Sequence, residues 1–297
     1  MNRFWTRFIG PIIEVVAPRQ LMEIGADSGW NTRNILDYCR QTGARADIID
    51  PAPRPELKDV LAAFPDTHVY HPLKSLDAIP LITPPDIALI DGDHNWRTVF
   101  QELTAVFARA NEMGAPPPIV ISHDCGWPYA RRDMYYNPSD FSERERHPFA
   151  YRGVAPGKAE LVDFGMNAML ANALYEGGPQ NGVLTGIEDF IASSGVPITF
   201  RQLPFFNGLG ILIPEARMTP ALKALVDSFF AAESLLETCI ALERDGMTVR
   251  VEVAHLNDRL AQRTEALQRA RRLLIEREAR INQLEAELTA VKVSAPA

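Results

Sequence analysis

The sequence has few cysteines, no excess of basic residues and no long apolar run. Its three cysteines, Cys39, Cys125 and Cys239, lie far apart without a C-x-x-C pair, which argues against a disulfide framework or a cysteine zinc site and indicates a reducing compartment. A net charge of −8 argues against nucleic-acid binding, because phosphate contacts need a basic surface. No apolar run approaches the ~20 residues that span a bilayer, and charges and Pro11 interrupt the N-terminus too early for a signal peptide. We expect a cytoplasmic protein with no membrane span.

The residues that are present favour an α/β fold. Hydrophobic residues make up 46% of the chain, and short apolar runs alternate with helical patterns, which is typical of a parallel sheet covered by helices. Seven runs are expected as strands, at residues 21–26, 46–50, 67–71, 86–91, 118–124, 198–203 and 209–214. The expected fold is a doubly wound, mostly parallel seven-stranded sheet with a C-terminal helical extension. Its last two strands are expected to form an antiparallel hairpin.

Helices are expected between these strands. Residues 31–43 form the first, with Asn31 or Thr32 as the N-cap and Gly43 as the stop. The helix after the fourth strand stops near Gly114. Its apolar face consists of Val99, Leu103, Val106 and Ala110. Another helix is expected at residues 186–195, and an irregular segment from residue 125 to about residue 182 is expected as one large insertion.

The composition changes after Pro214. A domain of residues 1–216 is expected to be followed by a helical connector of residues 217–248 and a coiled-coil tail of residues 249–293. Six aliphatic residues recur every seven positions: Val253, Leu260, Leu267, Leu274, Ile281 and Leu288. The offset register contains Leu256, Ala270, Leu284 and Val291, but also Arg263 and Arg277. The pattern favours a coiled coil that mediates self-association or partner binding, with a lone charged helix as the alternative.

The turn after the first strand, EIGADSGWNT, is of a nucleotide-binding type. Gly25 and Gly29 let the backbone pass close to a ligand, and the start of the helix offers free amides. The spacing is not the G-x-G-x-x-G of dinucleotide enzymes, and Glu23 with Asp27 would repel a pyrophosphate. Asp50 ends the second strand, where a carboxylate can accept both hydroxyls of a ribose. Together these residues favour S-adenosylmethionine, although a tight strand–helix turn alone would also explain the glycines.

Titratable side chains follow the fourth and fifth strands. Asp91, Asp93 and His94 come directly after the fourth strand, and His123 with Asp124 closes the fifth. If the strands are neighbours, their ends lie ~4.8 Å apart, and the carboxylates would repel each other without a cation. Oxygen-rich ligation suits Mg²⁺ or another hard divalent ion. The alternative is that the aspartates only cap the helices that follow.

The order of EIGADSGWNT, Asp50, IDGDH and ISHD resembles class I S-adenosylmethionine-dependent methyltransferases over about residues 10–215. The closest branch is the small metal-dependent O-methyltransferases related to the macrocin and mycinamicin enzymes, together with the similar cephalosporin hydroxylase family. The resemblance implies a Rossmann-like methyltransferase fold, with Asp91 and Asp124 as Mg²⁺ ligands and His94 as the general base. His123 stands where the sugar enzymes tend to have an acidic residue, so it is expected as a weaker ligand or as a neighbour of the metal.

The same resemblance implies a cofactor site lined by Glu23, Gly25, Asp50 and Ser75. We also expect Asp27, Gly29 and Asp91 to lie at the cofactor. The insertion begins with CGWPYARRDMYYNP, whose aromatic faces suit sugar rings and whose arginines suit hydroxyl or phosphate groups. Acceptor contacts are expected from Trp127, Tyr129, Arg131, Arg132 and Tyr135. Such a lid could exclude water from a methyl transfer, or it could be an ordered surface loop.

The leading functional hypothesis is O-methylation of a sugar hydroxyl in a glycan or a glycosylated natural product. Methylation of a catechol-like or other small hydroxyl compound is the second hypothesis within enzymes. A third hypothesis is a catalytically silent domain whose coiled coil scaffolds a biosynthetic assembly. The joint presence of Asp91, His94 and Asp124 argues against the silent domain.

Overall fold

The computed structural model describes the backbone of residues 1–294 and the side chains of residues 1–287, so the side chains of Leu288 and Val291 lie outside the described part. The chain divides into two compact units, Met1–Asp227 and Ser228–Ala297. The division into a domain, a connector and a tail at residues 216 and 248 stays a prediction. Within residues 1–294, no helix is both long enough and apolar enough to cross a membrane.

Strands and helices alternate along the first unit, as expected. Its strands are β1 (Gln20–Ile24), β2 (Arg45–Ile49), β3 (His68–His71), β4 (Ile87–Ile90), β5 (Ile119–His123), β6 (Met134–Tyr135), β7 (Phe149–Ala150), β8 (Ala171–Ala173), β9 (Ile198–Leu203) and β10 (Leu209–Pro214). The α-helices of the chain are α1 (Gly10–Val16), α2 (Trp30–Thr42), α3 (Glu56–Ala62), α4 (Ser75–Ala78), α5 (Trp96–Glu112), α6 (Val183–Ser193), α7 (Pro220–Ser228) and α8 (Ala232–Ser294). Short 3-10 or π segments include Asn2–Phe4, Trp5–Ile9, Ile79–Leu81, Pro138–Asp140 and Glu215–Arg217.

The main sheet has seven strands in the order β3-β2-β1-β4-β5-β10-β9. The first five pair in parallel, whereas β10 is antiparallel to both β5 and β9. This confirms the expected Rossmann-like sheet with its closing hairpin. Strand order reverses at β1, so β1 and β4 form the switch point beyond whose carboxyl ends ligands bind in doubly wound sheets.

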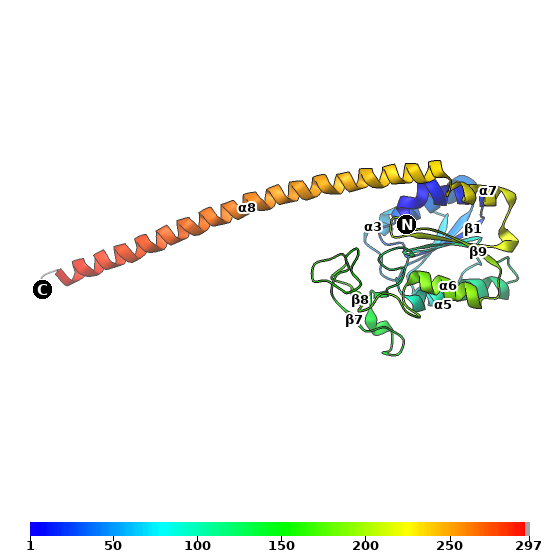
Figure 1. Cartoon of the computed structure of the whole chain (residues 1–297), viewed down its shortest axis with the longest axis horizontal. Coiled ribbons are helices and arrows are strands. Elements are labelled where there is room, and N and C mark those ends of the chain that lie inside the picture. The colour runs from blue at the N-terminus through cyan, green and yellow to red at the C-terminus, as the bar shows by residue number, and fades with distance from the viewer. Residues whose placement is uncertain (295–297) are drawn as a thin grey trace. The chain divides into compact units, whose positions relative to one another are not determined.

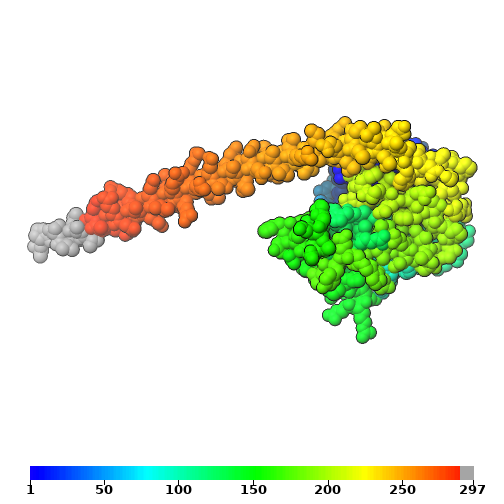
Figure 2. All heavy atoms as spheres, viewed as in Figure 1, coloured from blue at the N-terminus to red at the C-terminus, as the bar shows by residue number. Residues whose placement is uncertain are grey.

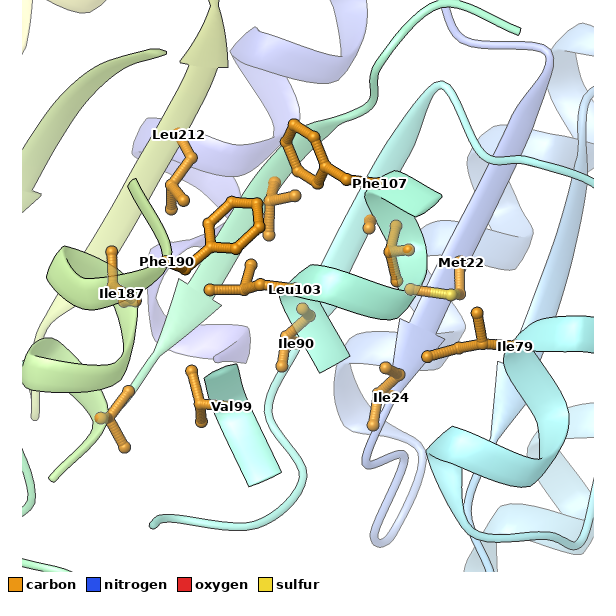
Figure 3. Packing of buried hydrophobic residues seen from close by; sticks show 14 of the residues in the cluster. Met22, Ile24, Ile79, Ile90, Val99, Leu103, Phe107, Ile187, Phe190 and Leu212 are labelled. Atoms are coloured by element: carbon orange, nitrogen blue, oxygen red, sulfur yellow. The ribbon is translucent and has the colours of Figure 1, made fainter. Parts of the chain in front are cut away.

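Helices α5 and α6 pack against each other on one side of the sheet (Figure 1). Val99, Leu103, Val106 and Ala110 are buried on the inner face of α5, as predicted. Figure 3 shows Val99 and Leu103 from α5 and Ile187 and Phe190 from α6 beside strand residues such as Ile90 and Leu212. Each buried side chain of this size contributes roughly 1.5–3 kcal/mol, so the cluster fixes the helices over β4 and β5.

The start of α2 differs from the prediction. Its N-cap is Gly29, in the left-handed region at φ 83°, and no side chain among residues 1–287 forms a cap hydrogen bond with it. The prediction of Asn31 or Thr32 as N-cap is wrong because both side chains turn inward and bond the buried Glu23. Gly43 ends the helix at φ 76°, as predicted.

The insertion is more ordered than its sequence suggests. It contains a second, three-stranded antiparallel sheet in the order β6-β8-β7, and it protrudes in green from the first unit in Figure 2. Its strands are two or three residues long, too short to show a period-two pattern.

The second unit consists mainly of α8, a continuous helix of 63 residues that appears in yellow to red in Figure 1. It runs without interruption through the predicted boundary between connector and tail at residue 248.

Candidate functional site

Three loops meet at the carboxyl-terminal edge of the sheet, after β1, β4 and β5. Strand β4 pairs with β1 on one side and with β5 on the other, and Ile90 lies opposite Ser122. The fourth and fifth strands are thus neighbours, the condition under which Asp91 and His123 were expected to meet.

The turn after β1 is a close backbone contact. Gly25 has φ 85°, and a Cβ atom at this position would lie 2.2 Å from the main-chain oxygen of Asp91. A side chain at residue 25 would therefore displace the loop that carries Asp91, whether or not a ligand is bound. Gly25 and Gly29 both need their left-handed conformation, so the tight-turn explanation of these glycines has a definite structural basis.

Glu23 is buried at the base of this turn. Asn31 donates to its Oε1 at 2.8 Å and the Thr32 hydroxyl to its Oε2 at 2.6 Å. Burial raises the pKa of Glu23 to about 7, although the two hydrogen bonds oppose the shift. Glu23 therefore ties the end of β1 to the first turn of α2.

Asp50 lies at the end of β2 beside the same turn. The backbone N–H of Asp27 donates to its Oδ2 at 2.8 Å, and the N–H of Ala52 donates to its Oδ1 at 2.9 Å. The Asp27 side chain points away and pairs with Arg54 at 2.8 Å, with both side chains more than half exposed. Asp50 thus gathers with Glu23, Gly25 and Gly29 around one turn, as predicted.

Asp91, His123 and Asp124 converge across β4 and β5. His123 Nδ1 lies 2.9 Å from Asp91 Oδ1 and 2.9 Å from Asp124 Oδ2. Asp91 Oδ2 also accepts from the Met1 amino group at 2.8 Å. One ligand atom from each of the three side chains lies within 4.8 Å of the other two.

His123 is held as a cation in this arrangement. Its Nδ1 faces two carboxylates and its Nε2 lies 3.1 Å from the Phe206 carbonyl, so both ring nitrogens face acceptors and must donate. Burial alone would lower the pKa of His123, but Asp91 and Asp124 outweigh it and raise the pKa to about 10. Two close carboxylates are therefore neutralised here by imidazolium.

His94 completes the cluster from the loop after β4. Its ring stacks on Tyr129 with centroids 5.4 Å apart and lies 5.5 Å from the ring of Tyr136. Its Nε2 lies 2.9 Å from Asp124 Oδ2, although neither buried ring nitrogen is assigned a hydrogen bond among the described residues. Burial would lower the pKa of His94, but Asp124 and then the carboxylates of Asp91 and Asp93 raise it above the ordinary value.

The donor set fits a divalent cation. Two carboxylates and one imidazole within ligand distance of one another form a mixed oxygen and nitrogen site. The Phe206 carbonyl can keep the proton of His123 on Nε2, which leaves Nδ1 as the ligand atom in the neutral ring. His94 lies beside this set, and its Nδ1 and Nε2 have no assigned hydrogen bond to any side chain or backbone group that the structure describes.

Asp93 has a structural role in the same loop. Its carboxylate accepts from the His94 backbone N–H and from the side chains of Asn95 and Thr98 at the start of α5. Asn95 is the N-cap of that helix and accepts from the Thr98 N–H. The helix-capping alternative thus holds for Asp93 and Asn95, whereas Asp91 and Asp124 face the cluster.

A cluster of aromatic rings beside His123 was not predicted from the sequence. The rings of Phe4, Phe8, Phe205 and Phe206 pack together, and Phe4 lies edge-on to His123 at 5.8 Å. Phe206 and Asn207 have positive φ, and Gly208 follows at 90° in the β9–β10 turn. The sequence PFFNG between two predicted strands indicates a turn, and this was the feature that could have pointed to Phe205 and Phe206. No feature of the sequence pointed to Phe4.

The expected acceptor residues are distributed over the insertion. Tyr129 lies on His94, and Trp127 is 39% exposed. The Arg131 guanidinium pairs with Glu188, and that of Arg132 is buried against the carbonyls of Ala159 and Ala173. The Tyr135 hydroxyl donates to Asp133 and accepts from the His147 N–H. The polar groups of Arg131, Arg132 and Tyr135 are thus engaged within the protein.

Two buried carboxyls were not singled out in the sequence. Asp133 accepts from the N–H groups of Trp96 and Gly182, so it joins the insertion to the starts of α5 and α6. Glu102 on α5 is 1% exposed and its Oε2 has no partner among the described residues. Burial raises the pKa of Glu102 to about 8, and a hydrogen bond with Ser75, an expected cofactor residue, lowers it in part.

Glu102 should make the folded state less stable as pH rises from about 4.5 to 8. In this range the unfolded carboxyl is ionised while the buried one keeps its proton, so unfolding releases a proton and becomes easier at higher pH. Glu102→Gln removes this titration. The free energy of unfolding of the variant minus that of wild type should therefore increase from pH 4.5 to 8. The increase should be at most roughly 1.4 kcal/mol per unit of difference between the folded and unfolded pKa of Glu102. Urea unfolding at pH 5 and pH 8.5 measures the trend. A difference that does not change with pH would contradict it.

No protein-family model matches the chain, and no curated protein matches it. Solved structures with a similar arrangement include the SAH-bound methyltransferase PaMTH1 of Podospora anserina, at 13% identity over 69% of this chain and 76% of that chain, with a TM-score of 0.41. A putative caffeoyl-CoA O-methyltransferase from Staphylococcus aureus has 14% identity over 69% of this chain and 80% of that chain, with a TM-score of 0.41. A putative O-methyltransferase from Klebsiella pneumoniae has 12% identity, 70% and 78% coverage and a TM-score of 0.40. At this level of similarity the functional argument depends on the chain's own residues.

Proposed function

We propose that this protein is an S-adenosylmethionine-dependent O-methyltransferase that acts on a sugar hydroxyl of a glycan or a glycosylated natural product, with a divalent cation. The observation that carries the proposal is the cluster of Asp91, His94, His123 and Asp124 at the sheet edge, one strand away from the β1 turn. A base and a cation site beside a nucleotide-type turn are groups that can promote the alkylation of a hydroxyl.

The cofactor is proposed to lie over the β1 turn. Asp50 is held by two backbone N–H groups, which leaves carboxylate lone pairs for the two ribose hydroxyls. Asp91 is proposed to supply negative charge near the ammonium and sulfonium groups, and Glu23, whose pKa burial raises to about 7, would add charge in its ionised form. Ser75 is proposed for the adenine end, and its hydroxyl contacts the buried Glu102.

In the proposed reaction the acceptor oxygen forms a bond to the methyl carbon as the carbon–sulfur bond breaks. The sulfonium becomes a thioether, and the hydroxyl proton passes to the imidazole of His94. Asp124 then stabilises the imidazolium, since its Oδ2 lies 2.9 Å from His94 Nε2. Both nitrogens of His94 are buried, so the acceptor must displace a covering group, and Tyr136, 59% exposed, is the proposed one.

Asp91, Asp124 and His123 Nδ1 are proposed to hold the divalent cation. When bound, the cation would lower the pKa of a coordinated acceptor hydroxyl. A nitrogen ligand fits Mn²⁺ at least as well as the Mg²⁺ expected from the sequence. The carboxylates would then be neutralised by the cation rather than by protonated His123.

A neutral polyhydroxylated acceptor is proposed because of the side chains left available around His94. The Arg131 and Arg132 guanidinium groups, which would suit a phosphate, are both engaged. The partly exposed rings of Trp127 and Tyr136 offer flat faces for a sugar. Methyl transfer from labelled S-adenosylmethionine to a panel of glycosides and catechols tests the acceptor class. Transfer only to catechols would overturn the sugar assignment, and cofactor binding without any turnover would favour the silent scaffold.

Asp50→Ala should weaken S-adenosylmethionine binding by ~1.5–3 kcal/mol, the range for a hydrogen bond to a charged group. Calorimetric titration measures the affinity, and a melting curve checks that the loop bonded by Asp50 still folds. Asp27→Asn is the matched control, because the Asp27 side chain points to Arg54 at the surface and asparagine tolerates the left-handed backbone of residue 27. Wild-type affinity in the Asp50 variant would refute this placement of the ribose.

A further inference from the structure

Helix α8 has two series of positions spaced seven residues apart, which together form one stripe on the helix, here called the seam. The size of the residues in each series changes along the helix. The first series of seam positions is small at Ala232, Cys239 and Gly246 and large at Val253, Leu260, Leu267, Leu274 and Ile281. The second series is large at Leu235, Leu242, Val249 and Leu256 and then contains Arg263, Ala270 and Arg277 before Leu284. All the large apolar side chains of both series are exposed. The N-terminal half of the helix therefore presents large residues in one series and the C-terminal half in the other.

The charge along α8 is also divided. Residues 232–258 carry six acidic side chains and two arginines, whereas residues 259–280 carry seven arginines and three glutamates. Figure 2 shows α8 in yellow, orange and red, and the exposed apolar side chains of the seam occur in both halves of this helix. An acidic half and a basic half on one helix are complementary to each other but not each to itself.

A parallel pair of these helices would place like charges together. In register, Arg263 and Arg277 would each face their own copy inside the seam, and the basic half would lie on the basic half. Arginines facing each other in a buried seam are destabilising, because each is partly desolvated beside a like charge. An antiparallel pair centred between residues 268 and 269 would avoid these contacts but would still place the basic half on itself.

We propose that α8 pairs with α8 of a second copy of this chain in antiparallel orientation, centred on Asp258. This register places Val249 opposite Leu267 of the second copy, and Leu242 opposite Leu274. It places the acidic half of each helix along the basic half of the other. The paired segment runs from about residue 235 to residue 281, roughly 70 Å at 1.5 Å per residue.

Both arginines of the seam are accommodated in this register. Arg263 lies opposite Val253 and Arg277 opposite Cys239 of the second copy, so neither faces another arginine. Their aliphatic stems can cover the seam while the guanidinium groups extend to the acidic half. At the flank of the seam, Glu243 lies near Arg271 of the second copy, and the symmetry makes this pair twice.

Disulfide trapping on the full chain tests the orientation. In a Cys239→Ser background, Val249→Cys and Leu267→Cys are made separately; the two remaining native cysteines, Cys39 and Cys125, are buried. Neither single variant should form a covalent dimer on oxidation, because its two thiols would lie roughly 27 Å apart. An equimolar mixture of the two variants should form one. Covalent dimers of the single variants would show a parallel pair and overturn the proposal.

Sedimentation tests whether the partner of α8 is a second copy of this chain, and a charge exchange tests the register of the pair. Full-length wild type should be a dimer, and a monomer would overturn the proposal in favour of a lone helix or another partner. Glu243→Arg or Arg271→Glu alone should raise the dimer dissociation constant roughly 2- to 30-fold, since two symmetric surface pairs are lost. The double variant should restore most of the affinity. Additive losses in the double variant would contradict the proposed register.

Discussion

His94→Ala should lower kcat by ~10²–10⁴-fold, the usual contribution of a general base. The reason is that Nε2 of His94 faces Asp124, while neither ring nitrogen of His94 is assigned a hydrogen bond within the described part of the chain. The affinity for S-adenosylmethionine should stay nearly unchanged, because the proposed cofactor contacts lie at the β1 turn. Steady-state kinetics and calorimetric titration on the same preparation measure the two effects.

Two further variants make this result specific. His94→Gln keeps a polar side chain between Tyr129 and Tyr136 but cannot accept the proton, so it should be as slow as the alanine variant. His147→Ala removes a histidine that contacts Gln180 in the insertion and should keep near-normal kcat. If the His94 variants keep most of the rate, the base lies elsewhere, and His123 is the next candidate.

Removal of divalent metal by a chelator should abolish the activity of the wild-type enzyme. Asp91→Asn should raise the metal concentration needed for half-maximal rate by one or more orders of magnitude. An amide replaces an anionic ligand atom, and only two charged or imidazole ligands would remain, Asp124 and His123. Rates measured against added Mn²⁺ and Mg²⁺ give the half-saturating concentrations.

Asp93→Asn is the matched control for this effect. Asp93 belongs to the same loop, but its carboxylate faces Asn95 and Thr98 at the start of α5. Its substitution should reduce stability and leave the metal requirement unchanged. If the wild-type enzyme remains active after exhaustive chelation while the His94 variant is inactive, the metal assignment is wrong. The reaction would then use His94 as a base without a metal ion.

The sequence was sufficient to predict the arrangement of strand ends. Wholly apolar runs such as Ile87–Ile90 indicate buried parallel strands, and residues that follow such strands must meet at one edge of the sheet. The proximity of Asp91 to His123 and Asp124 also required that the fourth and fifth strands be neighbours, which the sequence left open and the structure shows. The apolar face of α5 followed from its 3.6-residue period in the same way.

Contacts that depend on tertiary packing could not be predicted. Asn31 and Thr32 have the composition of N-caps, but a buried carboxylate competes for their side chains and Glu23 takes both. The clash that fixes Gly25 involves the backbone of Asp91, distant in sequence. The environment of Arg132 depends on carbonyls of Ala159 and Ala173 inside an insertion whose strands are too short for any periodic signal.

The most direct test of the proposed function is a crystal structure of the full chain grown with S-adenosylhomocysteine and Mn²⁺, with an anomalous difference map at the manganese edge. We expect the ribose hydroxyls on Asp50 and a single anomalous peak bound by Asp91, His123 Nδ1 and Asp124, beside the ring of His94. A ribose away from Asp50 would contradict the proposal. So would manganese that binds elsewhere while His123 Nδ1 keeps its contacts with Asp91 and Asp124.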